Sequence, residues 1–272
     1  MKLKIAHETT YHFDPPMRGV VQSHRLTPSV FEGQSVSNWQ VEVEGADRGA
    51  AFRDGAGDWI DTVTLRGPVD ALTVQVSGEV HTFDLGGVLR GHRERIVPAA
   101  YLRATHATEA DRHITELAAD AVAGIAETDP LARAHALCHA VAGAITYTPG
   151  QTEHGTKASE ALALGHGVCQ DHAHTIIACA LTLDMPARYI TGYLFSTEEE
   201  GMHEASHAWA EVFVPDLGWV GFDASNGVCP DDRYVRVGSG ADAEEAAPIR
   251  GVAQGAGAES LEARVRVDRA AQ

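Results

Sequence analysis

The sequence predicts an α+β protein in which an N-terminal antiparallel β-sandwich-like domain precedes a second, α+β domain. Residues 1–95 alternate apolar and polar side chains with the period of half-buried strands, and turn sequences interrupt this alternation. From about Thr108 the apolar residues recur with helical spacing, and strand-like segments follow these helices. We therefore expect a boundary near residues 95–107, with one domain over residues 1–97 and another over residues 98–272.

The first domain is expected to contain many short strands. One face of the first strand carries Leu3, Ile5, Thr9, Tyr11 and Phe13, and Pro15-Pro16 closes that strand. Alternation resumes at residues 39–43 and 72–80, with turn residues such as Asp54-Gly55 between the segments. Repeated short strands without a helical period are typical of an antiparallel sandwich.

The second domain is expected to place its helices before its sheet. We predict helices from about residue 108 to 125, from Asp129-Pro130 to about residue 145, and over residues 159–164 and 168–183. Strands are predicted at residues 188–195, 206–214 and 219–222. This core covers residues 108–228, and residues 229–272 are predicted to form a C-terminal β extension of the same domain.

Composition excludes several classes of partner. The chain has 272 residues with 21 Lys and Arg against 38 Asp and Glu, a net charge of −17. Such a charge opposes binding to nucleic acid and to anionic membranes. The sequence has no apolar run near the roughly 18 residues of a membrane span and no secretory signal at its N-terminus. We therefore expect a cytoplasmic protein with neither nucleic acid nor membrane as partner.

The four cysteines do not form a disulfide framework. They occupy positions 138, 169, 179 and 229 without a C-x-x-C pair, so reduced thiols are expected. Cys138 and Cys179 lie among apolar residues of predicted helices and are expected in the core, whereas Cys229 lies in a polar loop.

Cys169 is the most informative cysteine. Gly165 and Gly167 precede it, and it falls in the first turn of a predicted helix. Unpaired N–H groups and the helix dipole favour a thiolate at such a position, and the same N–H groups can stabilise an oxyanion. A small buried cysteine is the structural alternative.

A histidine and an acid follow in an order that suits a nucleophilic cysteine. His207, Trp209 and Glu211 share one face of a predicted strand, and the next strand ends at Asp223. An acid at that point can orient the imidazole and stabilise the imidazolium. Alternatively, Asp223 caps a turn and His207 is a core histidine.

These segments resemble the bacterial transglutaminase-like cysteine peptidases over nearly the whole chain. The resemblance rests on Gly-His-Gly-Val-Cys-Gln-Asp-His-Ala-His, Met-Pro-Ala-Arg-Tyr-Ile-Thr-Gly-Tyr-Leu, His-Ala-Trp-Ala-Glu-Val-Phe-Val-Pro and Gly-Trp-Val-Gly-Phe-Asp. It implies a papain-like catalytic core with Cys169 as nucleophile, His207 as base and Asp223 as orienting acid. His172 departs from the aromatic residue common in the family, and Ala224 departs from its proline.

Four further residues are candidates for contacts with the substrate or the oxyanion: Tyr147, Gln170, His172 and Trp209. The resemblance implies an aromatic donor upstream of the cysteine, for which Tyr147 is the candidate, although a core tyrosine fits that position equally well. His172 is either a residue that tunes substrate fit or a solvated histidine on the helix face.

Two metal-site interpretations fit poorly, and we expect neither a metal nor another cofactor. His203-Glu204-Ala-Ser-His207 matches H-E-x-x-H, but an extended chain separates the two histidines by roughly 13 Å. His166, Cys169, His172 and His174 form the second set, in which His172 and His174 point about 200° apart on a helix.

The predicted reaction is thiol-dependent acyl transfer on a peptide or amide bond through a thioester, with a peptide or protein as substrate. We expect hydrolysis, as in a peptidase or amidase, because water is always available as acceptor. A transglutaminase with an amine acceptor and a non-catalytic binding module of the same fold are the alternatives. The sequence assigns no oligomeric state.

Overall fold

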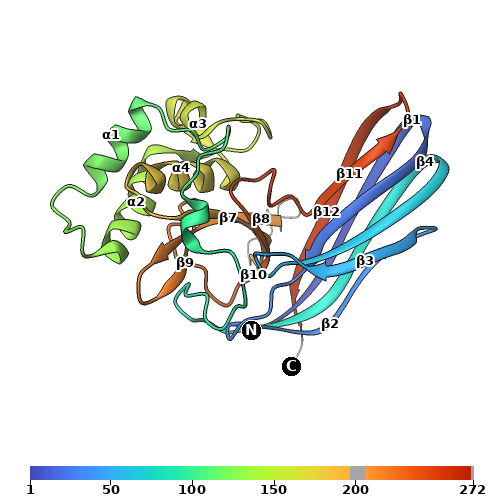
Figure 1. The fold of residues 1–272 in the computed structure, drawn as a ribbon, viewed down its shortest axis with the longest axis horizontal. Helices are drawn as coiled ribbons and strands as arrows, with labels where there is room; N and C mark the ends of the chain where they lie inside the picture. Colours follow the sequence, from blue (N-terminus) through green and yellow to red (C-terminus); the bar gives the residue numbers. More distant parts are fainter. Residues whose placement is uncertain (197–205, 271–272) are drawn as a thin grey trace.

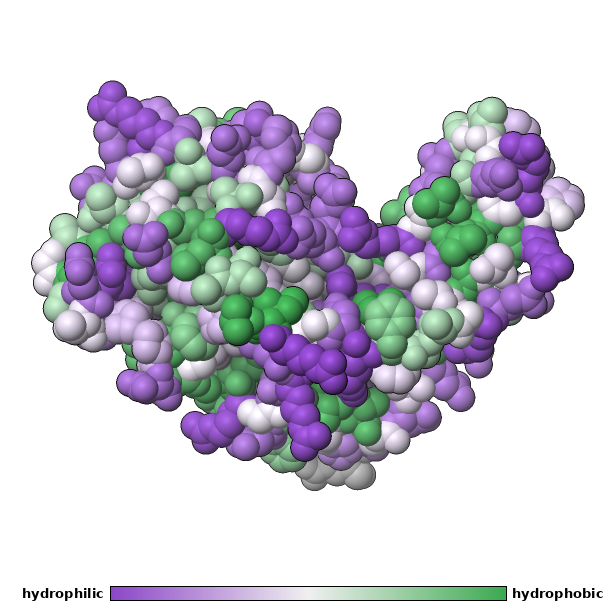
Figure 2. Space-filling view, in the orientation of Figure 1, coloured by the Kyte–Doolittle hydropathy of each residue, from purple (hydrophilic) through white to green (hydrophobic). Residues whose placement is uncertain are grey.

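The structure, a computed structural model, describes residues 1–196 and 206–270. A lobe of long strands lies beside a lobe of helices and shorter strands (Figure 1). A hollow separates the two lobes at one end of this face, and hydrophilic side chains spread over both of them (Figure 2).

Two unusually long strands organise the first lobe. β1 (Lys2–Thr27) and β4 (Trp59–Thr82) pair antiparallel along most of their length, with register shifts between His12 and Gly19. Four shorter strands extend this pair into a six-stranded sheet: β2 (Gln34–Val43), β3 (Asp47–Arg53), β11 (Ile249–Gln254) and β12 (Ala258–Arg269). β12 and β2 flank one half of the long pair, and β11 and β3 flank the other half.

The two halves of this sheet share a core. Leu26, from the half that β11 flanks, packs with Val74 and Val76, from the half that β2 flanks. Each of these three side chains is at most 3 % exposed. Their burial against one another folds the two halves of the sheet into the expected sandwich-like arrangement. The prediction of many short strands is wrong for the central pair, because β1 continues through Pro15-Pro16, where we expected it to end.

The C-terminal strands differ from the prediction. We expected residues 229–272 to extend the catalytic domain, and β10 (Tyr234–Gly240) does join its sheet. β11 and β12 instead pair with β1 in the first lobe. β4 occupies one edge of β1 and leaves the other edge for β11 and β12, and Val265 of β12 packs in the cluster around Leu3 and Ile5.

The second lobe contains a four-stranded sheet in the order β10-β7-β8-β9. Its other strands are β7 (Ala187–Leu194), β8 (Ser206–Val214) and β9 (Gly218–Phe222). The helices are η1 (Pro98–Tyr101), α1 (Arg112–Ala121), α2 (Pro130–Ala144), α3 (Ala158–Leu164) and α4 (Cys169–Thr182). Two short strands, β5 (Thr146–Tyr147) and β6 (His166–Gly167), pair with each other in parallel. In the described ranges, no helix has the length and apolar character needed to cross a membrane.

Helix α4 lies at the centre of the second lobe. All of its residues from 171 to 180 are buried, and they pack with the small side chains on one face of β8, Ala208 and Ala210. Cys138 and Cys179 belong to the same core, as predicted. Because alternate residues of a strand face opposite ways, His207, Trp209 and Glu211 lie on the other face of β8.

A buried ion network joins the lobes. Glu211 lies between two guanidinium groups, accepting from Arg188 at 2.7 Å and from Arg236 at 2.9 Å, and all three side chains are at most 4 % exposed. Arg188 also pairs with Glu94 at 2.5 Å, and its guanidinium lies 4.0 Å over the Trp219 ring. This arrangement compensates each charge that is removed from water.

Residues of strand β10 connect this ion network to the first lobe. Arg236 lies 3.3 Å from Asp58, whose other carboxylate oxygen accepts from the Ser239 backbone N–H at 2.7 Å. The Gln34 side chain exchanges two hydrogen bonds of 2.8 Å with the Arg236 backbone. The interface between the lobes is therefore polar and fully buried at its centre.

Removing the central charge should destabilise the fold. Glu211→Gln leaves Arg188 and Arg236 buried with less compensation, and we expect a loss of about 3–5 kcal/mol in the free energy of unfolding. Urea denaturation at pH 7 measures this loss. The control is Asp47→Asn, in an ion pair whose side chains are 88 % and 70 % exposed, for which a change within about 0.5 kcal/mol is expected. Equal effects of the two variants would contradict the importance of the buried network.

Stability should also depend on pH through Glu211. Burial raises the pKa of Glu211, but Arg236 and Arg188 outweigh burial and lower it from 4.5 to about 2. The resulting stabilisation is present above pH 4.5 and is lost as pH falls towards 2. Urea midpoints measured between pH 2 and pH 5 should fall less steeply in Glu211→Gln than in the unaltered protein.

Candidate active site

Cys169 is the first residue of α4 and is partly exposed. Asp171 shapes this helix start, because its Oδ2 accepts from the Val168 backbone N–H at 2.8 Å and from Thr152 Oγ1 at 2.7 Å. The N–H groups of Cys169 and Gln170 have no acceptor inside the helix. The thiol therefore lies beside N–H groups that can stabilise negative charge.

His207 and Asp223 form a close pair on neighbouring strands. His207 is the second residue of β8, and Asp223 follows β9 directly. His207 Nε2 lies 2.7 Å from Asp223 Oδ2, and the two side chains are only 7 % and 1 % exposed. Asp223 is thus close enough to orient the His207 imidazole.

Cys169 lies beside the same imidazole. It is close enough to His207 to raise the pKa of the imidazole. Because Asp223 occupies Nε2, the ring nitrogen that remains for Cys169 is Nδ1. The three residues therefore form a chain from thiol to imidazole to carboxylate.

Five donors besides His207 hold the Asp223 carboxylate. Oδ1 accepts from the Ser225 backbone N–H at 3.0 Å, from Ser225 Oγ at 2.6 Å and from the Asn226 backbone N–H at 3.2 Å. Oδ2 accepts from Asn226 Nδ2 at 2.7 Å and from the Tyr234 hydroxyl at 2.8 Å. Burial raises the pKa of Asp223, but His207, Asn226 and Ser225 together hold it well below its usual range. Asp223 is therefore ionised at neutral pH.

The pKa of His207 is shifted in the opposite direction from that of Asp223. Burial lowers the pKa of His207, but its hydrogen bonds with Asp223 and Cys169 and the charges of those groups raise it to about 10. His207 is consequently protonated at neutral pH. An imidazolium beside a nucleophilic cysteine can donate a proton to a leaving amine.

Trp209 and Tyr234 pack around the imidazole. Their ring centroids lie 6.3 Å and 5.8 Å from that of His207. Trp209 fits beneath two glycines of the neighbouring strands, because a Cβ on Gly192 would lie 2.8 Å from its ring and one on Gly221 would lie 3.4 Å from its Nε1. The predicted candidate Trp209 is thus part of the wall around His207.

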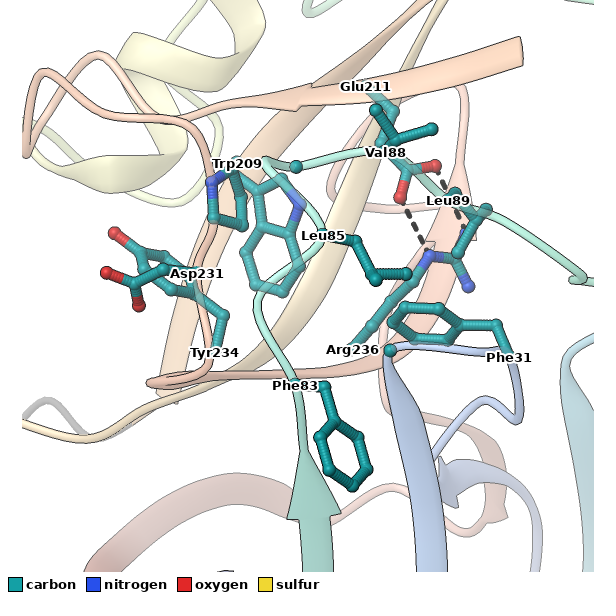
Figure 3. A pocket seen from close by; sticks show the side chains of 13 residues that line it. Phe31, Phe83, Leu85, Val88, Leu89, Trp209, Glu211, Asp231, Tyr234 and Arg236 are labelled. Atoms are coloured by element: carbon teal, nitrogen blue, oxygen red, sulfur yellow. Dashed lines mark hydrogen bonds and ion pairs between the residues drawn. The ribbon is translucent and has the colours of Figure 1, made fainter. Parts of the chain in front are cut away.

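Trp209 and Tyr234 also line a small cavity (Figure 3). Phe31, Phe83 and Leu85 contribute apolar side chains to it, and the Glu211–Arg236 ion pair lies at one end (Figure 3). Its volume of about 40 Å³ is room for a few water molecules. An amino-acid side chain is too large to enter it without movement of these walls.

The other predicted substrate residues have different positions. Tyr147, 40 % exposed, lies in β5 next to Gly167 of β6, close in the chain to Cys169. Gln170 donates from Nε2 to the His154 carbonyl at 2.9 Å, which links α4 to the preceding loop.

His172 is buried, contrary to both predicted roles. Its exposed fraction is 2 %, and its two ring nitrogens lie 2.9 Å from the Val168 carbonyl and 3.0 Å from the Ile145 carbonyl. The side chain has no ring nitrogen left for a substrate or an oxyanion. Its observed role is to connect the start of α4 to the end of α2.

Sequence reasoning missed Asn226 and Tyr234. Asn226 lies three residues after Asp223, and an Asp-x-x-Asn segment at a strand end is a recognisable signal for a side-chain-stabilised turn. Tyr234 is eleven residues from Asp223 on a different strand, and no local pattern connects the two.

The described residues contain no group of three or more His, Cys, Asp or Glu side chains arranged to hold a metal ion. His203 and Glu204 of the H-E-x-x-H segment lie outside the described residues. His207 itself lies in a strand, where its Nε2 lies 2.7 Å from Asp223 Oδ2 and 3.4 Å from Asn226 Nδ2.

Relatives of this chain occur in mycobacteria. An uncharacterised protein of Mycobacterium leprae is 27 % identical over 288 residues, which cover 99 % of each chain. An uncharacterised protein of Mycobacterium tuberculosis is 37 % identical over 116 residues, which cover 39 % of this chain and 37 % of that protein.

The fold also matches a solved structure. A candidate cysteine protease from Cytophaga hutchinsonii superposes with a TM-score of 0.74 over 100 % of this chain and 91 % of that one. At 22 % identity this likeness concerns the fold alone, and it confirms the predicted α+β architecture with a papain-like, transglutaminase-like core.

Family comparison covers both lobes. Residues 117–224 match the transglutaminase-like superfamily, and this range includes Cys169, His207 and Asp223. Residues 3–81 match the bacterial transglutaminase-like N-terminal region. The resemblance inferred from the sequence is thereby confirmed, and the chain is a transglutaminase-like protein with a bacterial transglutaminase-like N-terminal region.

Proposed function

We propose that this protein catalyses thiol-dependent acyl transfer on peptide or amide bonds, with Cys169 as nucleophile, His207 as acid and base, and Asp223 as orienting carboxylate. One observation carries the proposal. A buried imidazole lies 2.7 Å from a carboxylate, and the cysteine at a helix start is close enough to raise the pKa of that imidazole. Nucleophile, base and orienting group in this order are the elements that covalent catalysis by cysteine requires.

The reaction begins when the Cys169 thiolate attacks the amide carbonyl carbon. A carbon–sulfur bond forms, and the negative charge moves to the carbonyl oxygen, where the Cys169 N–H and one further donor stabilise it. The His207 imidazolium then gives its proton to the amide nitrogen. The carbon–nitrogen bond breaks, the amine leaves, and a thioester remains on Cys169.

Water completes the cycle in the proposed hydrolysis. Neutral His207 takes a proton from the attacking water, the carbon–sulfur bond breaks, and the acid product leaves. Partial exposure of Cys169 supports access of water to the thioester. An amine acceptor at the same step would make the protein a transglutaminase. A peptide or protein substrate and a cytoplasmic location belong to the same proposal.

The nucleophile can be tested by alkylation. We expect Cys169 to react with iodoacetamide at pH 6 at least about tenfold faster than Cys229, because the His207 imidazolium stabilises an ionised sulfur. Burial and the charge of Asp84 raise the pKa of Cys229. Intact mass and tryptic mapping measure both rates, and His207→Ala should abolish the difference.

The matched control is His166→Ala. This variant removes an exposed histidine three residues before Cys169 that hydrogen-bonds Thr148, and it should leave the rate at Cys169 unchanged. Cys169 labelling no faster than Cys229 in the unaltered protein would remove the support for a nucleophile, and the non-catalytic binding module would then explain the fold better.

The acceptor can be tested with a peptide library and a fluorescent primary amine. We expect new carboxyl termini or glutamate side chains in the products and less than about one tenth as much amine incorporation. Cys169→Ala should lower the rate at least about 10³-fold, because the thioester can no longer form. Amine incorporation that exceeds hydrolysis would overturn the hydrolase assignment in favour of the transglutaminase.

A further inference from the structure

We infer that Tyr234 is a positioning residue of this site, whose hydroxyl acts through Asp223 to set the acidity of His207. The inference rests on the proposed function for its catalytic meaning. Its structural basis is a single carboxylate oxygen. Asp223 Oδ2 accepts from Tyr234 at 2.8 Å and faces His207 Nε2 at 2.7 Å.

Tyr234 is buried against His207 and Trp209, with its hydroxyl directed at Asp223. It is 5 % exposed, its ring lies edge-on to His207, and its centroid is 5.5 Å from that of Trp209. Burial and the neighbouring Asp223 raise its pKa well above the ordinary value for tyrosine. The hydroxyl therefore keeps its proton and remains a donor to Asp223.

A donor on Oδ2 weakens the attraction of that oxygen for the His207 proton. A hydrogen bond to a carboxylate favours the ionised form and spreads its charge, so the carboxylate is a weaker base. An imidazolium beside a weaker base is a stronger acid. His207 must release its proton to a leaving amine, and Tyr234 favours that release.

Asn226 donates to the same Asp223 oxygen as Tyr234 but comes from a different part of the chain. It belongs to the turn that follows Asp223, and its backbone and side chain together contact both carboxylate oxygens. Tyr234 comes from β10 and reaches across to the pair without any local connection. The other charged groups that influence the pKa of Tyr234 are Asp231 and Arg233, which pair with each other at 2.8 Å. The side chains that raise the pKa of His207 are Asp223 and Cys169.

The test is the NMR titration of the His207 imidazole in a Cys169→Ala background, where the thiol no longer contributes. We expect Tyr234→Phe to raise the His207 pKa by about half to one pH unit, the amount that loss of one hydrogen bond represents. Replacement of Tyr234 by 3-fluorotyrosine, a stronger donor of nearly the same shape, should lower it. Shifts of opposite sign cannot arise from a general loosening of the fold.

The matched control is Tyr193→Phe. Tyr193 is 3 % exposed, and its hydroxyl hydrogen-bonds His7 at 2.9 Å, away from Asp223. This variant should leave the His207 pKa unchanged. The inference is overturned if Tyr234→Phe leaves that pKa unchanged, if both tyrosine variants change it equally, or if 3-fluorotyrosine shifts it upward.

A kinetic measurement on the Cys169 protein connects the inference to catalysis. Tyr234→Phe should slow acylation by an amide at least threefold more than acylation by a thioester, because only the amine needs a proton in order to leave. Equal slowing of both substrates would overturn the catalytic meaning. The NMR titration needs no substrate, so a shifted His207 pKa in a protein without hydrolase activity would reject the proposed function and keep Tyr234 in its role.

Discussion

The carboxylate of Glu211, buried between Arg188 and Arg236, is the interaction on which the two lobes depend. Arg188, Arg236 and Glu211 together carry a net charge of +1 into the interior. Glu94 and Asp58 add two negative charges from segments that precede α1, and Arg25, 3.5 Å from Asp58, adds a positive one, so the charges balance. Removing any one of these groups leaves another buried with less compensation. Since Glu211 and His207 lie on the same face of β8, the strand that the network fixes is also the strand that positions the imidazole.

The candidate site follows the same physical rule on a smaller scale. Asp223 is buried and ionised, and six hydrogen bonds surround its two oxygens. A carboxylate held in this way does not reorganise when charge moves during a reaction, and such preorganisation is a major source of catalytic stabilisation. Of Cys169, His207 and Asp223, only Cys169 is partly exposed, and the other two are buried.

Local sequence patterns predicted most of the helices and strands, including the elements that carry Cys169, His207 and Asp223. Gly167 before a helix start, alternation around His207 and a strand that ends at Asp223 are short-range signals, and each identified its element. The two predicted positions of His172, exposed to solvent or facing the substrate, were both wrong. The sequence does not show that the Ile145 carbonyl, at the end of α2, lies beside the imidazole. Nothing near Arg188, Glu211 or Tyr234 in the chain indicates its partner, since those pairings exist only after strands distant in sequence become neighbours.

The same limit explains the error at the C-terminus. Residues 229–272 were predicted as a β extension of the second domain, but alternation indicates which face of a strand is buried and not which sheet the strand joins. β10 pairs with β7, whereas the next two strands pair with β1. The choice depends on which sheet edge is unoccupied, and that is a property of the assembled lobe.

The pairing of β1 with β12 has a consequence for folding. Leu3 pairs with Arg269, so this contact closes a segment that contains nearly all of the described chain. Closing so long a segment makes the contact slow, and one edge of β1 stays open to other strands until β12 is in place. The helical lobe has more local contacts and can form earlier. A folding chain can therefore hold the helix that carries Cys169 while the strand lobe still lacks β12.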